Sequence, residues 1–190
     1  VEQHFTQISN ISQQIDMLES MATATSTYRE QLSAAYLARA MEFALVQDYS
    51  SAIDDVTKAV LIDEQLYFGY FCRAYWRYKL FEYKRAMGES FDIAEIELML
   101  RDYDYIIKNE PDFSFAYYNK ANMICLQRDF RSAISYYTKA IEIDNDFAEA
   151  YFNRGLTYIY INEIDKGLAD LSKAGELGIY QAYNLISRFQ

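Results

Sequence analysis

The sequence of 190 residues contains a single proline and only six glycines, so it has few of the residues that interrupt helices. Segments that alternate polar and apolar residues, as half-buried strands do, are almost absent as well. Helix is therefore expected to dominate the structure. Because 52% of the residues are hydrophobic and 17% are aromatic, the chain has ample material for a core.

Cysteine and histidine are also scarce. Cys72 and Cys125 fall in helix-like stretches far apart in the sequence, and His4 is the one histidine. A zinc site needs about four Cys, His or carboxylate ligands at suitable spacing, so we expect neither a metal site nor another cofactor. We interpret both cysteines as small buried thiols, and so few cysteines suit a reducing, cytosolic setting.

The sequence lacks basic clusters and long apolar runs. Its formal net charge is −10, and its lysines and arginines are scattered singly. Since neutralising phosphates needs a local basic surface, nucleic acid and anionic membranes are not expected as partners. No run approaches the roughly 18 apolar residues of a membrane span, so no membrane insertion is expected. A cytoplasmic location is favoured because no signal peptide opens the sequence, while a chain that begins at Val1 leaves open a targeting segment upstream.

Catalytic constellations are missing too. There is no Ser/His/Asp set and no glycine-rich phosphate loop, and His4 lies near one end of the chain. We therefore expect no catalytic residues and a protein that is not an enzyme. Carboxylates do occur close together, Asp54 beside Asp55 and Asp102 near Asp104. We interpret these four as part of a solvated helix face.

What the sequence does contain is an internal repeat between Ser114 and Gln181. Its period, about 34 residues, is typical of stacked helical hairpins. Each repeat holds two stripes of 3.6-residue periodicity joined by a short polar turn, which predicts two helices per repeat. The residue pairs that match at this shift include Ala116/Ala150, Tyr117/Tyr151, Asn119/Asn153, Ala121/Gly155, Lys139/Lys173 and Ala140/Ala174.

The segment AYYNKANMICLQRDFRSAISYYTKAIEIDNDF, residues 116–147, resembles the tetratricopeptide repeat family in its order of aromatic residues, small residues and a lysine–alanine pair. The resemblance implies an all-α fold, a right-handed α-solenoid of helical hairpins. It also implies a module that binds proteins or peptides, a scaffold for protein–protein interaction.

Four hairpins are expected, at about residues 33–66, 67–113, 114–147 and 148–181, followed by a C-terminal capping helix over 182–190. The shift that carries the first repeat onto the third, Tyr36 onto Tyr117, exceeds two periods by about 13 residues. This difference predicts an insertion near residues 81–94 and a protruding tip on the second hairpin. Residues 1–27 are expected to form an N-terminal amphipathic helix and a joint. The apolar stripe of that helix is Phe5, Ile8, Ile11, Ile15 and Leu18.

In this family the first helix of each hairpin lines a concave groove. Aromatic side chains bury roughly 150–250 Å² each, so even half-exposed ones in such a groove would exceed the roughly 300–600 Å² of a typical largest surface patch. We therefore expect a protein or peptide partner there, with the asparagines orienting its backbone; alternatively, many of these residues pack between neighbouring helix pairs. The resemblance assigns to the groove Phe68, Phe71, Tyr75, Tyr78, Phe115, Tyr118, Asn119, Asn122, Phe152, Asn153 and Ile159.

Two other functions share these features. One is self-assembly into a homo-oligomer, in which the groove or the N-terminal stripe meets a second copy. The other is a chaperone-like holder of a partner segment. Some family members grip a C-terminal carboxylate with lysines, asparagines and an arginine; Asn119 and Asn153 match the asparagines, but Phe115 replaces the first lysine, and Tyr183 and Ser187 replace the later cations. Recognition of a carboxylate tail is therefore not expected.

Overall fold

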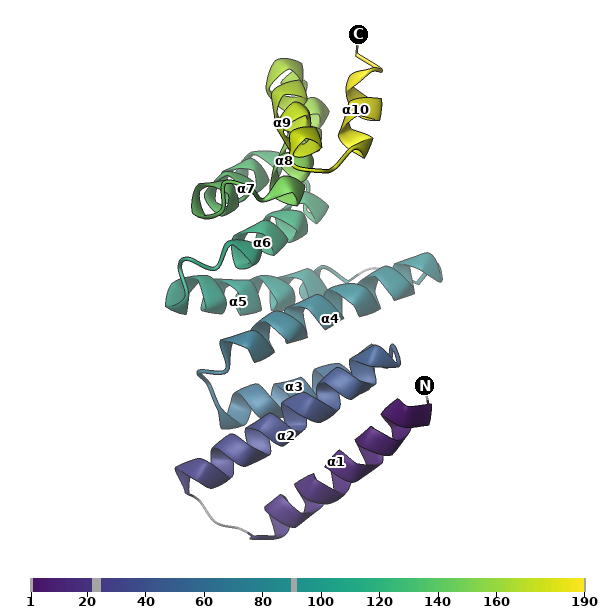
Figure 1. Cartoon of the computed structure of the whole chain (residues 1–190), viewed down its shortest axis with the longest axis vertical. Coiled ribbons are helices and arrows are strands. Elements are labelled where there is room, and N and C mark those ends of the chain that lie inside the picture. Colours follow the sequence, from purple (N-terminus) through teal and green to yellow (C-terminus); the bar gives the residue numbers. More distant parts are fainter. Residues whose placement is uncertain (1, 22–24, 90–91, 190) are drawn as a thin grey trace. The chain divides into compact units, whose positions relative to one another are not determined.

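The computed structural model describes residues 2–21, 25–89 and 92–189, and helices make up most of them (Figure 1). Within these ranges there is no strand, which confirms the all-α prediction. The helices are α1 (Glu2–Met21), α2 (Ser26–Leu45), α3 (Tyr49–Ile62), α4 (Tyr67–Ala86), α5 (Ile93–Asn109), α6 (Ser114–Leu126), α7 (Phe130–Ile143), α8 (Ala148–Tyr160), α9 (Ile164–Glu176) and α10 (Gln181–Ile186).

The helices form two compact units, residues 1–105 and 106–190, and the division falls within α5. In unit 1, α1 packs against α2, and α3 packs against both α2 and α4. In unit 2, α7 packs against α6 and α8, and α9 packs against α8 and α10. Packing between successive helices is the pattern of stacked repeats. We call α2, α4, α6 and α8 the first helices of the hairpins, and α3, α5, α7 and α9 the second helices.

Small residues stand where the two helices of a hairpin meet. Ala40 in α2 and Ala52 in α3 are both fully buried in one cluster. In the last hairpin the contact is closer still: a Cβ atom added to Gly155 would lie 2.9 Å from the carbonyl oxygen of Gly167. A larger side chain at such a place would push the two backbones apart.

The turns inside the hairpins share one conformation. Gln47, Arg128 and Asn162 have φ of 63°, 65° and 66°, and each lies within the turn between a first and a second helix. A residue in this left-handed region directly after a helix lets the chain turn while its N–H bonds back to the helix. The second hairpin uses Gly88, with φ of 78°, near the end of α4.

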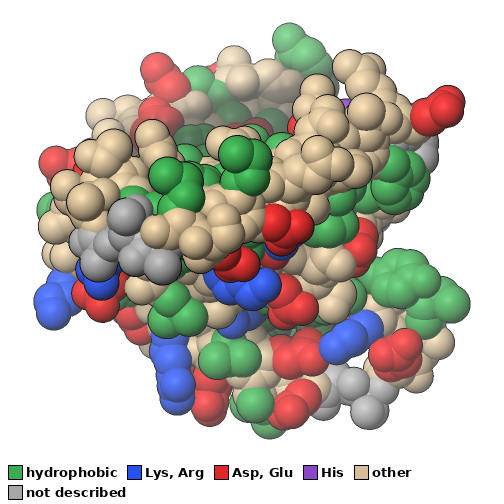
Figure 2. All heavy atoms as spheres, turned by 90° about the horizontal axis from the view of Figure 1, so that it is seen from below, with side chains coloured by type: hydrophobic (Ala, Val, Ile, Leu, Met, Phe, Trp, Pro, Cys, Tyr) green, Lys and Arg blue, Asp and Glu red, His purple; other side chains and the backbone are tan. Residues whose placement is uncertain are grey.

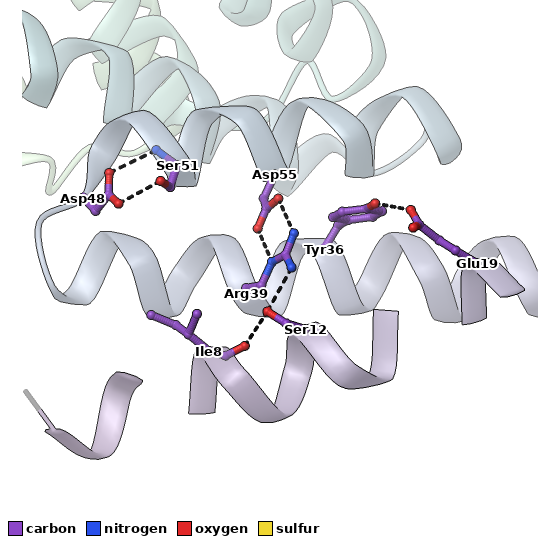
Figure 3. Close-up of polar contacts among 8 residues, drawn as sticks. All are labelled: Ile8, Ser12, Glu19, Tyr36, Arg39, Asp48, Ser51 and Asp55. Atoms are coloured by element: carbon purple, nitrogen blue, oxygen red, sulfur yellow. Dashed lines mark hydrogen bonds and ion pairs between the residues drawn. The ribbon is translucent and has the colours of Figure 1, made fainter. Parts of the chain in front are cut away.

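An aspartate caps the second helix in two of these turns. Asp48 Oδ1 accepts a hydrogen bond from the Ser51 N–H at 3.1 Å, and Asp48 Oδ2 accepts one from the Ser51 hydroxyl at 2.7 Å (Figure 3). Asp129 accepts the equivalent bond from the Ser132 N–H at 3.2 Å. Each cap satisfies an amide that lacks a partner within its helix.

Replacement of Asp48 by alanine is expected to lower the free energy of unfolding by about 1 kcal/mol, because α3 then loses its cap. Urea denaturation followed by circular dichroism measures the change. Ser50→Ala is the matched control, since Ser50 is exposed and lies in the same turn of helix. Equal losses in the two variants would contradict the role of Asp48.

The N-terminal helix α1 is covered by α2. Ile15, which is 2% exposed, and Leu18 lie in a cluster with Leu32 and Tyr36 of α2. Phe5 does not share this contact, because its side chain is 56% exposed. Helix α2 therefore covers Ile15 and Leu18 of the stripe, while Phe5 stays exposed, and contact of the stripe with a second copy of the chain stays a prediction.

The opposite side of α1 is polar. Gln3, Gln7, Asn10 and Gln14 are all exposed. Figure 2 views the molecule from the end that carries α1 and shows hydrophobic, acidic and basic side chains scattered among other side chains and backbone.

The second hairpin is the longest. Helix α4 has 20 residues and α5 has 17, against 13 or 14 in α3, α6, α7, α8 and α9. Phe81, Ile96 and Met99 are buried in this longer part. Residues 90–91 of the expected insertion and residues 22–24 of the expected joint lie outside the described residues, and the division into four repeats stays a prediction. No helix in the described part of the chain is long and apolar enough to span a membrane.

Candidate functional site

The structure distributes the predicted groove residues over three first helices. Four belong to unit 1 and seven belong to unit 2, so the site is built separately within each unit. Helix α4 carries Phe68, Phe71, Tyr75 and Tyr78; α6 carries Phe115, Tyr118, Asn119 and Asn122; and α8 carries Phe152, Asn153 and Ile159.

In unit 1 the predicted residues divide into exposed and packed ones. Phe68 is 53% exposed and Tyr75 is 41% exposed. Phe71 is half-buried, with its ring edge against the ring of Tyr103 at 6.4 Å between centroids. Tyr78 donates a hydrogen bond from its hydroxyl to Glu82 Oε1 at 2.9 Å. We define the first-helix face of unit 1 as Met41, Leu45, Phe68, Phe71, Tyr75 and Tyr78; Met41 and Leu45 of α2 are exposed as well.

In unit 2 the aromatic residues gather on Phe147. The ring centroids of Phe115 and Tyr118 each lie 4.8 Å from that of Phe147, which is only 5% exposed. Phe115 itself remains 47% exposed. We define the first-helix face of unit 2 as Phe115, Tyr118, Asn119, Asn122, Phe152, Asn153, Leu156 and Ile159.

Phe147 was missed at the sequence level, although the repeat contains the signal for it. Phe113 precedes Phe147 by one period of the repeat. Leu66, Phe113 and Phe147 are the residues that directly precede α4, α6 and α8. A large apolar residue thus stands directly before three of the four first helices, a recurrence that the self-match could have revealed.

Two of the three predicted groove asparagines form side-chain hydrogen bonds within the protein. Asn122 Oδ1 accepts a hydrogen bond from the Tyr137 hydroxyl at 2.6 Å and another from Asn153 Nδ2 at 3.0 Å. Asn153 Nδ2 also donates to the Tyr118 hydroxyl at 3.0 Å. Burial raises the pKa of Tyr118 and of Tyr137, so both hydroxyls keep their protons. The side chain of Asn119 makes no hydrogen bond among the described residues, so it is the amide left for a ligand.

The two cysteines differ in their surroundings. Cys72 is buried, and burial raises the pKa of its thiol to about 12. Cys125 is only half-buried, and its Sγ lies 3.8 Å from the Tyr137 hydroxyl. The interpretation as buried thiols therefore holds for Cys72 but only in part for Cys125. The described part of the chain has no cluster of three or more His, Cys, Asp or Glu able to hold a metal ion.

A repeated ion pair joins the first helix to the second helix of three hairpins. Arg39 donates to both oxygens of Asp55 at 2.6 and 2.8 Å, and its Nη1 reaches the Ser12 hydroxyl at 3.0 Å (Figure 3). Arg154 holds Asp170 in the same way at 2.7 and 2.8 Å. The pairs recur because the arginine occupies the same place in each repeat.

The second and third hairpins vary this pair. In the second, Arg73 Nε donates to Asp102 Oδ2 at 2.9 Å, and Arg77 Nη1 donates to the same oxygen at 2.9 Å. In the third, Lys120 Nζ donates to the Tyr136 hydroxyl at 2.8 Å. A cation of every first helix thus turns toward the second helix of its own hairpin.

These contacts correct the interpretation of the paired carboxylates. Asp55 is 3% exposed and Asp102 is 4% exposed, so neither lies on a solvated face. Asp54 and Asp104 are exposed. Helix residues one or two positions apart point in different directions, about 100° per residue, so one aspartate of each pair meets the first helix while the other faces water. The sequence signal is the identical spacing of Arg39–Asp55 and Arg154–Asp170.

Comparisons with known proteins find the same repeat motif and the same fold. A family model described as TPR repeat, the tetratricopeptide repeat, matches residues 121–159. A curated relative is the Hsp70-Hsp90 organizing protein of Triticum aestivum, 38% identical over 52 residues, or 27% of this chain and 9% of the relative. Another is the mitochondrial import receptor subunit TOM70 of Mus musculus, 28% identical over 100 residues, or 52% of this chain and 16% of the receptor. The chain therefore spans less than a fifth of the length of each.

Solved structures resemble the chain over most of its length. The crystal structure of YrrB, described as a TPR protein with an unusual peptide-binding site, matches with a TM-score of 0.66 and 17% identity, covering 93% of this chain and 87% of YrrB. A double mutant of MamA from strain RS-1 matches with a TM-score of 0.68 and 13% identity, covering 94% and 91%. At these identities the likeness concerns the fold.

Proposed function

We propose that this chain, whose residues 121–159 match the tetratricopeptide repeat and whose fold resembles such proteins, acts as a non-catalytic adaptor that binds a protein or peptide segment on its first-helix faces. The observation that carries the proposal is the exposure of large apolar side chains there. Phe68, Tyr75 and Phe115 are each more than 40% exposed. Exposed apolar side chains that share a face are typical of protein interaction sites.

The resemblances support an interaction role of this kind. YrrB is described as having a peptide-binding site, and the Hsp70-Hsp90 organizing protein and TOM70 carry names that refer to partner proteins and to import. Phe68, Tyr75 and Phe115 are the apolar anchors of the proposal. Phe71 and Tyr78 in unit 1 and Tyr118 and Phe152 in unit 2 are half-buried, and they contribute through the exposed parts of their rings; Ile159 in unit 2 is half-buried as well.

The triple variant Phe68→Ala/Tyr75→Ala/Phe115→Ala is expected to bind about tenfold or more weakly to a peptide selected on the wild-type protein from a phage-displayed random library. The reason is that truncating an aromatic anchor at a binding face commonly weakens the binding free energy by more than about 1 kcal/mol. Isothermal titration calorimetry with the selected peptide measures the change.

The matched control is Leu61→Ala/Leu98→Ala/Tyr180→Ala. Those three side chains are exposed by 74%, 41% and 73% but lie outside the first helices. They should leave binding unchanged. Equal affinity of the triple variant and the wild type, with the selected peptide still bound, would refute the proposed role of these faces.

A further inference from the structure

We infer that a segment bound on the first-helix face of either unit is uncharged and apolar, and that its terminal carboxylate takes no part in binding. The inference rests on the proposed function and adds the chemistry of the ligand. It is drawn from where the charged side chains of the first helices point.

The first-helix faces are almost free of charge. On α4, the helix positions on this side are Phe68, Phe71, Cys72, Tyr75, Tyr78 and Lys79. The equivalent positions in α2, α6 and α8 follow when Ala34, Phe115 and Glu149 are aligned with Phe68. Among all these positions only Lys79 and Glu149 are charged, whereas 24% of the whole chain is charged. Lys79 lies in unit 1 and Glu149 in unit 2, so these positions carry a single charge in each unit of a chain of net charge −10.

The basic side chains in the middle of the first helices already form ion pairs or hydrogen bonds with the second helices. Arg39, Arg73 and Arg154 hold buried aspartates of their own hairpins, and Lys120 holds the Tyr136 hydroxyl. Lys79 Nζ donates to Glu82 Oε2 on the same helix at 2.9 Å. A bound carboxylate would therefore find no cation reserved for it on the described part of these faces.

The polar group that remains suits a neutral main chain. The side chain of Asn119 can donate and accept at once, as a peptide group does, and it has no partner among the described residues. A charged side chain pressed onto Phe115 or Phe68 would lose water without gaining a counter-ion, which is costly. An apolar side chain at the same place gains from burial.

The test uses synthetic peptides built from Leu, Phe, Ser, Gly and Gln, each in matched versions with a central Leu, Asp or Lys and with a free or amidated C-terminus. Fluorescence anisotropy at low and high salt gives the affinities for the full chain. We expect the central Asp and Lys to weaken binding about tenfold. Amidation and salt should change it less than about twofold, since no charge pair is formed. Asn119→Ala should weaken binding of the neutral peptides, and Ser50→Ala, which lies outside these faces, should not.

Two results would overturn the inference, and they can be told apart. If Asp-containing or free-carboxylate peptides bind more tightly than neutral ones, and Phe115→Ala still weakens them, the ligand class is wrong while the proposed function stands. If no peptide of any class binds in a way that depends on Phe68 or Phe115, the proposed function fails and the inference fails with it.

Discussion

Replacement of Asp55 by alanine should lower the free energy of unfolding by about 3–5 kcal/mol. Asp55 is 3% exposed, and both of its oxygens accept hydrogen bonds from Arg39 (Figure 3). Without the carboxylate, the Arg39 guanidinium stays largely buried beside neutral groups, the Ser12 hydroxyl and the rings of Tyr36 and Phe43. Most of the loss comes from this uncompensated charge rather than from the contact itself. Guanidinium denaturation of the full chain measures it.

The adjacent residue provides the control. Asp54 is exposed, so Asp54→Ala should change stability by no more than about 0.5 kcal/mol. The double variant Arg39→Leu/Asp55→Leu should lose less than Asp55→Ala alone, because it removes both charges together. A loss after Asp55→Ala no larger than the loss after Asp54→Ala would show that the buried pair does not hold α2 to α3.

Replacement of Gly155 by leucine should cost about 3 kcal/mol, at the upper end of what overpacking usually costs. A Cβ atom there meets the Gly167 carbonyl oxygen at 2.9 Å and the Asp170 Cβ at 3.1 Å. The first of these neighbours is backbone, so α8 and α9 must separate, and the Arg154–Asp170 pair would be strained with them. The higher helix propensity of leucine stabilises the folded state by less than about 1 kcal/mol, which offsets only part of this loss. Thermal unfolding followed by circular dichroism measures the net effect.

Gly175 serves as the comparison for Gly155. The three atoms nearest to a Cβ atom at Gly175 are ring atoms of Tyr183, the closest at 2.6 Å, and Tyr183 is 45% exposed. Because an exposed ring can rotate away, Gly175→Leu should cost clearly less than Gly155→Leu. Similar costs at both sites would mean that the close approach of α8 and α9 does not limit the packing of this hairpin.

These scaffold contacts also shape the candidate site. Each inward cation of a first helix pairs with its own second helix, which removes positive charge from the face that a ligand would meet. Hydrogen bonds around Asn122 likewise make two side-chain amides less available to a ligand. Asn122 and Asn153 already bond to each other and to tyrosine hydroxyls. The groups that stay open are Asn119 and the exposed apolar side chains.

Much of the fold could be predicted from the sequence because it depends on local periodicity. The repeat period predicted stacked helical hairpins, and the helix-period stripes with a single proline predicted an all-α chain. The stripe of α1 was correctly expected to need cover. The groove residues came from the family resemblance, and their use by a ligand stays a prediction.

What the sequence alone determined is therefore the order of helices and the places where small residues allow them to meet, since both follow from residue spacing along a single helix. Only the tertiary structure decided which of two neighbouring aspartates is buried, which asparagine keeps its amide free, and that Phe147 packs against Phe115 and Tyr118. These outcomes depend on contacts between helices. A rotation of one helix by a single residue would reassign them without changing its apolar pattern by much, so periodicity could not settle them.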